Sequence, residues 1–144
     1  MSQENVEVIR RLLPGPDVDL AQGLRDDTLW AVTSQAWAAV THPGFQCVIE
    51  MPSQRSTHVG VDGLREAWLD WLEPWESYYT RIEELIDAGD AVVAIVRDRA
   101  RRKGVDADVE LLASNVSVFR DGKILRIGFY AKRADALEAA GLSE

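Results

Sequence analysis

The hydrophobic pattern of this 144-residue chain changes near Tyr78 from the period of a helix to the period of a strand. Before Tyr78, apolar residues recur every three or four positions, most clearly in the segment that starts at Asp62 and stops before Pro74. After Tyr78 the period is two. Helices followed by a run of strands favour an α+β fold, with helices gathered on one side of a mostly antiparallel sheet. The expected strands cover residues 80–87, 91–100, 109–119 and 123–131.

Proline and glycine divide the rest of the chain into short elements. Pro14 ends the first helix, and Pro43 with Gly44 follows another that ends near Val40. Gly141 follows the last helix and suits a left-handed C-cap. We expect helices at residues 2–13, 20–25, 27–40, 62–73 and 133–140, a short strand at 45–50 and a loop at 52–60.

Charge and cysteine content exclude several classes of protein. The chain has 16 Lys and Arg against 24 Asp and Glu, and its formal net charge of −8 argues against binding to nucleic acid or to an anionic membrane surface. No apolar run approaches the ~20 residues of a membrane span. Cys47 is the only cysteine, so no internal disulfide can form, and the polar start at residues 1–5 is unlike a secretory signal. We therefore expect one domain over residues 1–144 and a cytoplasmic location.

The hairpin at Arg120, Asp121 and Gly122 predicts which side chains share a face of the sheet. A three-residue loop with Gly122 in a bulge pairs Phe119 with Lys123, and so Asn115 with Ile127. One face is mostly apolar and is expected to pack under the helices: Leu111, Ala113, Asn115, Ser117, Phe119, Leu125, Ile127 and Phe129. The opposite face is less polar than a solvent-exposed face, with Leu112, Val116, Val118 and Tyr130, and it suggests a homodimer interface rather than a partly exposed sheet.

Aromatic residues in the expected helices suggest a pocket. All five tryptophans lie between Trp30 and Trp75, and stripes at helical spacing are usually core. The alternative is that some of them wall an apolar cleft above the sheet, where Asn115 and Ser117 bind a ligand instead of bonding within an ordinary core. The candidate ligand-binding residues are Trp30, Trp37, Met51, Trp68, Trp71, Arg97, Asn115, Ser117, Ile127 and Phe129.

Two charged groups are candidates for the mouth of that cleft. Glu50 ends the short strand, and a carboxylate beside an apolar cleft could move protons, although a solvated glutamate is the simpler interpretation. Arg97 and Asp98 face opposite sides of their strand, and the sequence does not decide which points inward; surface ion pairs are the alternative for Arg97. His42 and His58 lie far apart in the sequence, and no spacing indicates a metal site, a phosphate loop or a Cys–His pair. We expect no cofactor.

Several local strings resemble the nuclear transport factor 2-like superfamily, in particular its SnoaL-like, polyketide cyclase-like branch. They are the stretches at residues 60–68, 86–93 and 119–124 and the ending at 134–142, so the resemblance covers about residues 45–142. It implies a cone-shaped, curved antiparallel sheet wrapped around a pocket that the N-terminal helices cap. It also implies homodimers through the outer face of the sheet.

The resemblance carries over few functional residues. The general-base aspartate of isomerase-like members falls at Met51, with Glu50 adjacent, and their protonated aspartate falls at Asn115. The acidic pattern of epoxide hydrolase-like members is lost at residues 127–132, and only Glu50 or Asp98 could serve polyketide cyclase-like proton transfer.

Three hypotheses remain open. The first is a binder of a small hydrophobic or aromatic molecule. The second is a cofactor-free cyclase, isomerase or lyase, with Glu50 as base and Asn115 steadying an enolate. The third is a dimeric scaffold with a vestigial pocket.

Overall fold

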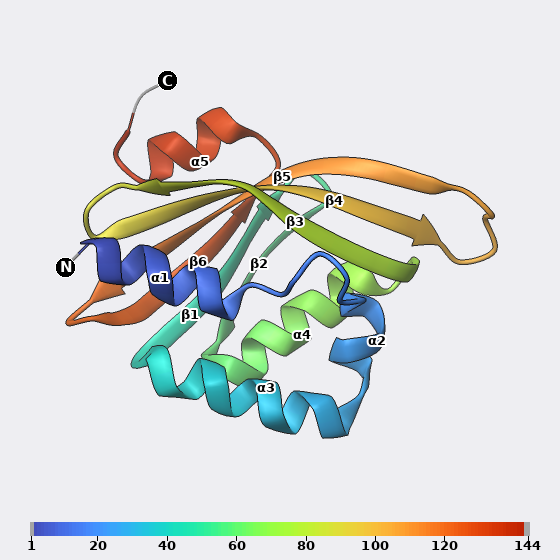
Figure 1. Ribbon diagram of the computed structural model, residues 1–144, viewed down its shortest axis with the longest axis horizontal. Helices are drawn as coiled ribbons and strands as arrows, with labels where there is room; N and C mark the ends of the chain where they lie inside the picture. Colours follow the sequence, from blue (N-terminus) through green and yellow to red (C-terminus); the bar gives the residue numbers. More distant parts are fainter. Residues whose placement is uncertain (1, 143–144) are drawn as a thin grey trace.

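The computed structural model describes residues 2–142, which form a single mixed sheet with helices on both faces (Figure 1). The helices are α1 (Ser2–Leu12), α2 (Leu20–Arg25), α3 (Asp27–Val40), α4 (Gly60–Leu72) and α5 (Arg133–Ala139). The strands are β1 (Thr41–Met51), β2 (Gln54–Val59), β3 (Trp75–Asp87), β4 (Ala91–Arg102), β5 (Asp108–Arg120) and β6 (Lys123–Tyr130). The expected α+β class is confirmed.

The sheet has six strands in the order β2-β1-β6-β5-β4-β3 and is curved without closing on itself. Each neighbouring pair is antiparallel except β1 and β6, which run parallel. These two strands are far apart in the sequence, so no hairpin forces them to run in opposite directions. Register shifts within β3 and between β1 and β6 accompany the curvature, as bulges bend a strand.

The largest differences from the expected strands are in β1, β2 and β3. Strand β1 begins at Thr41 instead of residue 45. Residues 54–59, expected to be loop, form β2 and pair with β1 after a turn at Pro52 and Ser53. Polar residues on both faces of this edge strand hid its period. Strand β3 begins at Trp75 instead of residue 80. The prediction placed the start too late because Trp75 continues the helical spacing of Trp68 and Trp71.

The β5–β6 hairpin closes with a two-residue turn. Asp121 and Gly122 both have positive φ, at 53° and 79°, and Arg120 pairs directly with Lys123. An irregularity follows in β6, and Asn115 pairs with Phe129 instead of the expected Ile127. The predicted register is therefore wrong by two residues at this point. A shift of two preserves the face of each side chain, so the expected inner face is kept, except that Ile124 replaces Leu125 in the core.

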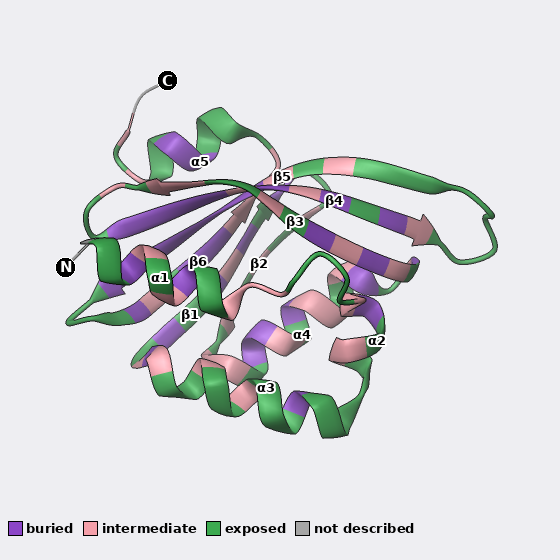
Figure 2. Cartoon of the chain, viewed as in Figure 1, coloured by how far each residue is buried: buried purple, intermediate pink, exposed green. Residues whose placement is uncertain are grey.

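Helices α1 to α4 cover the concave face of the sheet, and α5 packs on the opposite face (Figures 1 and 2). On the concave side, Phe45 and Ile49 of β1 pack with Leu64 of α4. On the opposite side, Leu137 of α5 packs with Val116. Helix α5 thus occupies part of the face expected to form a homodimer, and dimerisation through the remainder of it stays a prediction.

Two arginine side chains join the helices to one another and to the sheet. Arg25, at the end of α2, donates from Nη2 to the carbonyl oxygens of Leu72 (2.6 Å) and Trp75 (2.8 Å), where α4 ends and β3 begins. Arg65 of α4 donates to the carbonyl of Leu24 at 2.9 Å. The helical layer is therefore connected by side-chain donors that satisfy carbonyl groups at element ends.

We expect Arg25→Ala to lower the free energy of unfolding by about 1–3 kcal/mol, because two partly buried carbonyl groups lose their donor. Arg10→Ala is the matched control: it also removes one positive charge, but from an exposed ion pair with Glu7 at 3.3 Å, and its effect should stay within about 0.5 kcal/mol. Urea unfolding of both variants measures the difference. Equal midpoints would show that Arg25 does not hold α2 in place.

Candidate functional site

A cavity of about 500 Å³ lies between the concave face of the sheet and helices α1 to α4. Apolar side chains make up most of its wall, and strands β1, β3, β4, β5 and β6 supply its floor. The residues predicted to bind a ligand that line it are Trp30, Trp37, Met51, Trp68, Trp71, Asn115, Ile127 and Phe129.

Aromatic contacts hold one wall of the cavity in a fixed geometry. The rings of Trp68 and Phe129 lie 5.4 Å apart at an interplanar angle of 90°. Trp68 makes a second edge-to-face contact with Tyr78, at 6.0 Å and 78°. Such pairs add about 0.5–1.5 kcal/mol each beyond the area they bury. The wall is therefore a rigid apolar surface contributed by α4, β3 and β6.

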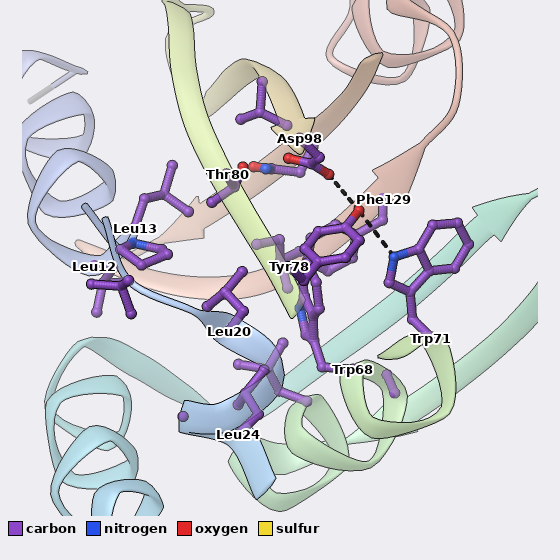
Figure 3. Close-up of a pocket in the computed structure, with 18 of the residues that line it drawn as sticks. Leu12, Leu13, Leu20, Leu24, Trp68, Trp71, Tyr78, Thr80, Asp98 and Phe129 are labelled. Carbon is purple, nitrogen blue, oxygen red and sulfur yellow. Dashed lines mark hydrogen bonds between the residues drawn. The ribbon is translucent and has the colours of Figure 1, made fainter. Parts of the chain in front are cut away.

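Polar groups meet at the β3–β4 side of the cavity. Thr80 and Asp98 are cross-strand partners on the concave face. The Trp71 indole Nε1–H donates to the Tyr78 hydroxyl oxygen at 3.1 Å, and the Tyr78 hydroxyl donates to Asp98 Oδ2 at 2.5 Å (Figure 3). This chain of hydrogen bonds runs from α4 to β4 through one tyrosine.

Burial raises the pKa of Asp98 above that of an ordinary carboxyl, and the neighbouring Thr80 and Tyr78 hydroxyl groups oppose part of this shift. Only 3% of Asp98 is exposed. Burial also raises the pKa of Tyr78, and the charge of Asp98 raises it further. Among the described residues, Asp98 Oδ1 has no hydrogen-bond partner of standard geometry, although the Thr80 hydroxyl lies beside the carboxyl group. The site therefore holds a carboxyl group with an increased affinity for a proton and one oxygen free to bond.

Asn115 supplies a second unsatisfied acceptor. It is buried on β5, lines the cavity and lies between Ala94 of β4 and Phe129 of β6. Within residues 2–142 its Oδ1 has no hydrogen-bond partner. A buried acceptor without a partner costs about 1–3 kcal/mol, and a ligand that donates a hydrogen bond would remove this cost.

Three of the expected site residues do not line the cavity. Ser117 is fully buried beneath it. Glu50 is exposed and faces the other side of β1, 3.9 Å from Arg55, because its neighbours Ile49 and Met51 point inward. The expectation that Glu50 lies at the mouth of the cleft is therefore wrong.

The expectation for Arg97 is also wrong. Asp98 points into the cavity, so Arg97 points away from it and bonds to Glu83 (3.0 Å) and Glu110 (3.2 Å) on the outer face. Its strand runs without the irregularity that would have reversed this orientation. The ion-pair alternative left open by the sequence is the one observed.

Tyr78 and Thr80 were missed as site residues. The expected strand began at residue 80, which left Tyr78 in a connecting segment. A signal was present in β4, where Val92, Ala94 and Val96 alternate inward and place Asp98 in phase with them. A carboxyl group in phase with buried residues indicates an interior polar site.

Residues 2–142 contain no group of three or more His, Cys, Asp and Glu placed to hold a metal ion. None of their helices is long and apolar enough to cross a membrane.

Comparisons with known proteins agree with this architecture. A family model described as a SnoaL-like domain matches residues 24–127. No curated protein matches the chain. Among solved structures, a protein described as a SnoaL-like polyketide cyclase from Jannaschia sp. CCS1 aligns with a TM-score of 0.65 and 18% identity, over 88% of this chain and 84% of that one.

Two further solved structures contain small molecules. TerC, co-crystallised with polyporic acid, aligns with a TM-score of 0.65 and 18% identity, over 96% of this chain and 98% of that one. A protein of ketosteroid isomerase-like fold from Catenulispora acidiphila, in complex with trimethylamine, aligns at 0.56 and 16% identity, over 76% and 82%. At these identities the likeness shows the fold alone. Because the family model spans well over half of its length, the chain belongs to the SnoaL-like family.

Proposed function

We propose that this protein binds a small, largely apolar molecule that carries at least one hydrogen-bond donor. The observation that carries the proposal is the pair of buried acceptors, Asp98 Oδ1 and Asn115 Oδ1, which border a mostly apolar cavity and have no hydrogen-bond partner of standard geometry among the described residues. Buried polar atoms in folded proteins are nearly always bonded, so an exception at a cavity wall favours a ligand group as the partner.

The size and lining of the cavity support a compact aromatic or polycyclic ligand. A volume of about 500 Å³ lies within the usual range for small-molecule sites. The edge-to-face arrangement of Trp68 and Phe129 leaves rigid apolar surface for such a ligand. The similar fold of TerC, which was co-crystallised with polyporic acid, supports a small-molecule ligand.

A second candidate function is cofactor-free proton transfer on such a molecule. The specific observation in its favour is Asp98, whose pKa is raised by burial and whose Oδ2 accepts from Tyr78. A carboxylate whose pKa is raised by burial is a stronger base than an exposed aspartate, so it is better suited to exchange a proton with a bound substrate. Tyr78 would hold the carboxyl oriented, and Asn115 would orient the reacting group. Glu50 has no part in this scheme, since it lies outside the cavity.

Binding can be tested with 2-hydroxyanthraquinone and its methyl ether, 2-methoxyanthraquinone, as matched probes. The hydroxyl compound donates a hydrogen bond and the ether does not. We expect the hydroxyl compound to quench tryptophan emission with a Kd about 5- to 150-fold lower, which corresponds to the ~1–3 kcal/mol of one satisfied buried acceptor.

Asn115→Leu should reduce that preference, and Glu50→Gln, which alters a carboxylate outside the cavity, should leave it unchanged. Absence of quenching by both compounds would count against a ligand site. Equal affinity for both compounds would count against a donor on the ligand.

The proton affinity of Asp98 can be tested through stability. A raised carboxyl pKa means that the folded state holds the proton more tightly than the unfolded chain, so this contribution to stability is present at low pH and is lost as pH rises through the folded pKa. Asp98→Asn cannot ionise. Between pH 4 and pH 8 its free energy of unfolding should therefore improve relative to that of the wild type, as measured by urea unfolding.

The control for this experiment is Asp121→Asn, an exposed residue in the β5–β6 turn, where asparagine also accepts a positive φ. Its stability should follow the wild type at both pH values. If Asp98→Asn and Asp121→Asn showed the same pH dependence, the carboxyl in the cavity would be an ordinary one and proton transfer would lose its support.

A further inference from the structure

A second cluster of reactive side chains lies at the edge of the sheet, outside the cavity. Ser56 and His58 are two residues apart on the edge strand β2, and Glu66 lies beside them in the second turn of α4. The Ser56 Oγ is 2.9 Å from His58 Nε2, and His58 Nδ1 is 2.8 Å from Glu66 Oε1. These are hydrogen-bond distances on both ring nitrogens of one histidine.

We propose that Ser56 is an activated nucleophile, that His58 is its general base, and that Glu66 is the positioning residue. A carboxylate can only accept a hydrogen bond, so the contact with Glu66 places the ring proton on His58 Nδ1. Nε2 then carries the lone pair that accepts the Ser56 hydroxyl proton. This order of nucleophile, base and acid is the one that nucleophilic serine chemistry requires, and it is recognised by geometry rather than by position in the sequence.

The local fold explains why the three groups meet. Ser56 pairs with Ile49 and His58 with Cys47, both of which face the core, so the Ser56 and His58 side chains turn toward α4. At Gly63 the helix approaches so closely that a Cβ would lie 3.0 Å from the backbone carbon and the Cβ of His58. Glu66 follows Gly63 by three residues on the same helical face and therefore reaches the ring.

Exposure differs among the three residues in the way the proposed roles require. The His58 side chain is 9% exposed, which fixes the orientation of its ring. Ser56 is only half-buried and can be reached from solvent at the open edge of the sheet.

The substrate class that fits is a small ester with a good leaving group, such as an aryl ester of a short carboxylic acid. In the acylation step, Ser56 Oγ forms a bond to the carbonyl carbon, the bond to the aryl oxygen breaks, and the hydroxyl proton passes through His58 Nε2 to the leaving phenol. Water then attacks the acyl-serine, gives a proton to His58 and releases the carboxylic acid, and the proton returns to Ser56.

The test is labelling of the whole protein with an alkyl fluorophosphonate, followed by intact-mass measurement and peptide mapping. The reagent forms a bond from Ser56 Oγ to phosphorus and loses fluoride, and it selects serines that a neighbouring base activates. We expect one adduct, located on Ser56 and absent from Ser56→Ala. His58→Gln should slow labelling by about 10²- to 10⁴-fold, the usual contribution of a general base.

Thr57→Ala is the matched control, because it removes the neighbouring hydroxyl on the opposite, exposed face of β2 and should label at the wild-type rate. Glu66 is exposed, so Glu66→Gln should fold normally. It should slow labelling, and Glu66→Asp should restore part of the rate, which a purely structural carboxylate would not do. No adduct on the wild type, or an adduct that persists in Ser56→Ala, would overturn the proposal.

Discussion

The hydrogen bond from Tyr78 to Asp98 connects the layers of the molecule around its cavity. The Tyr78 hydroxyl also accepts from Trp71 of α4, and its backbone N–H donates to Asp19 Oδ1, which caps α2. One residue of β3 therefore makes contacts with α2, α4 and β4. A buried carboxyl is unfavourable unless it is bonded, so the fold must keep these groups in contact. The cavity lies between the helices and the sheet, beside this chain of hydrogen bonds.

The sequence predicted the face of a side chain better than its exact pairing partner. Side chains alternate strictly along a strand, so Asn115, Ile127 and Phe129 were assigned to the inner face correctly although the register was wrong by two residues. The same alternation places Glu50 and Arg97 on the outer face, because each lies next to a residue that points inward. The sequence left the inward side of residues 97 and 98 open, so a surface position for Arg97 was one of its alternatives.

Boundaries and long-range pairs were beyond the sequence for a different reason. The edge strand β2 carries polar residues on the side that faces α4, and only pairing with β1 makes it a strand. Tyr78 and Asp98 are 20 residues apart, and nothing in their local sequence indicates that they bond. Family resemblance supplied the sheet and the pocket, but the positions it offered for acid–base groups, Met51 and Asn115, hold no carboxyl group.

The cluster at the cavity and the cluster at the sheet edge differ in whether their polar atoms have hydrogen-bond partners. For this reason, different measurements test their functions. At the cavity, Asp98 and Asn115 each retain a buried acceptor without a partner in the described residues. Such atoms reduce stability, and in natural proteins this cost is concentrated at functional sites. At the sheet edge, both nitrogens of His58 are bonded. Its geometry is stable without any ligand, so stability measurements cannot reveal its role, and only the reactivity of Ser56 distinguishes a nucleophile from a surface hydrogen-bond network.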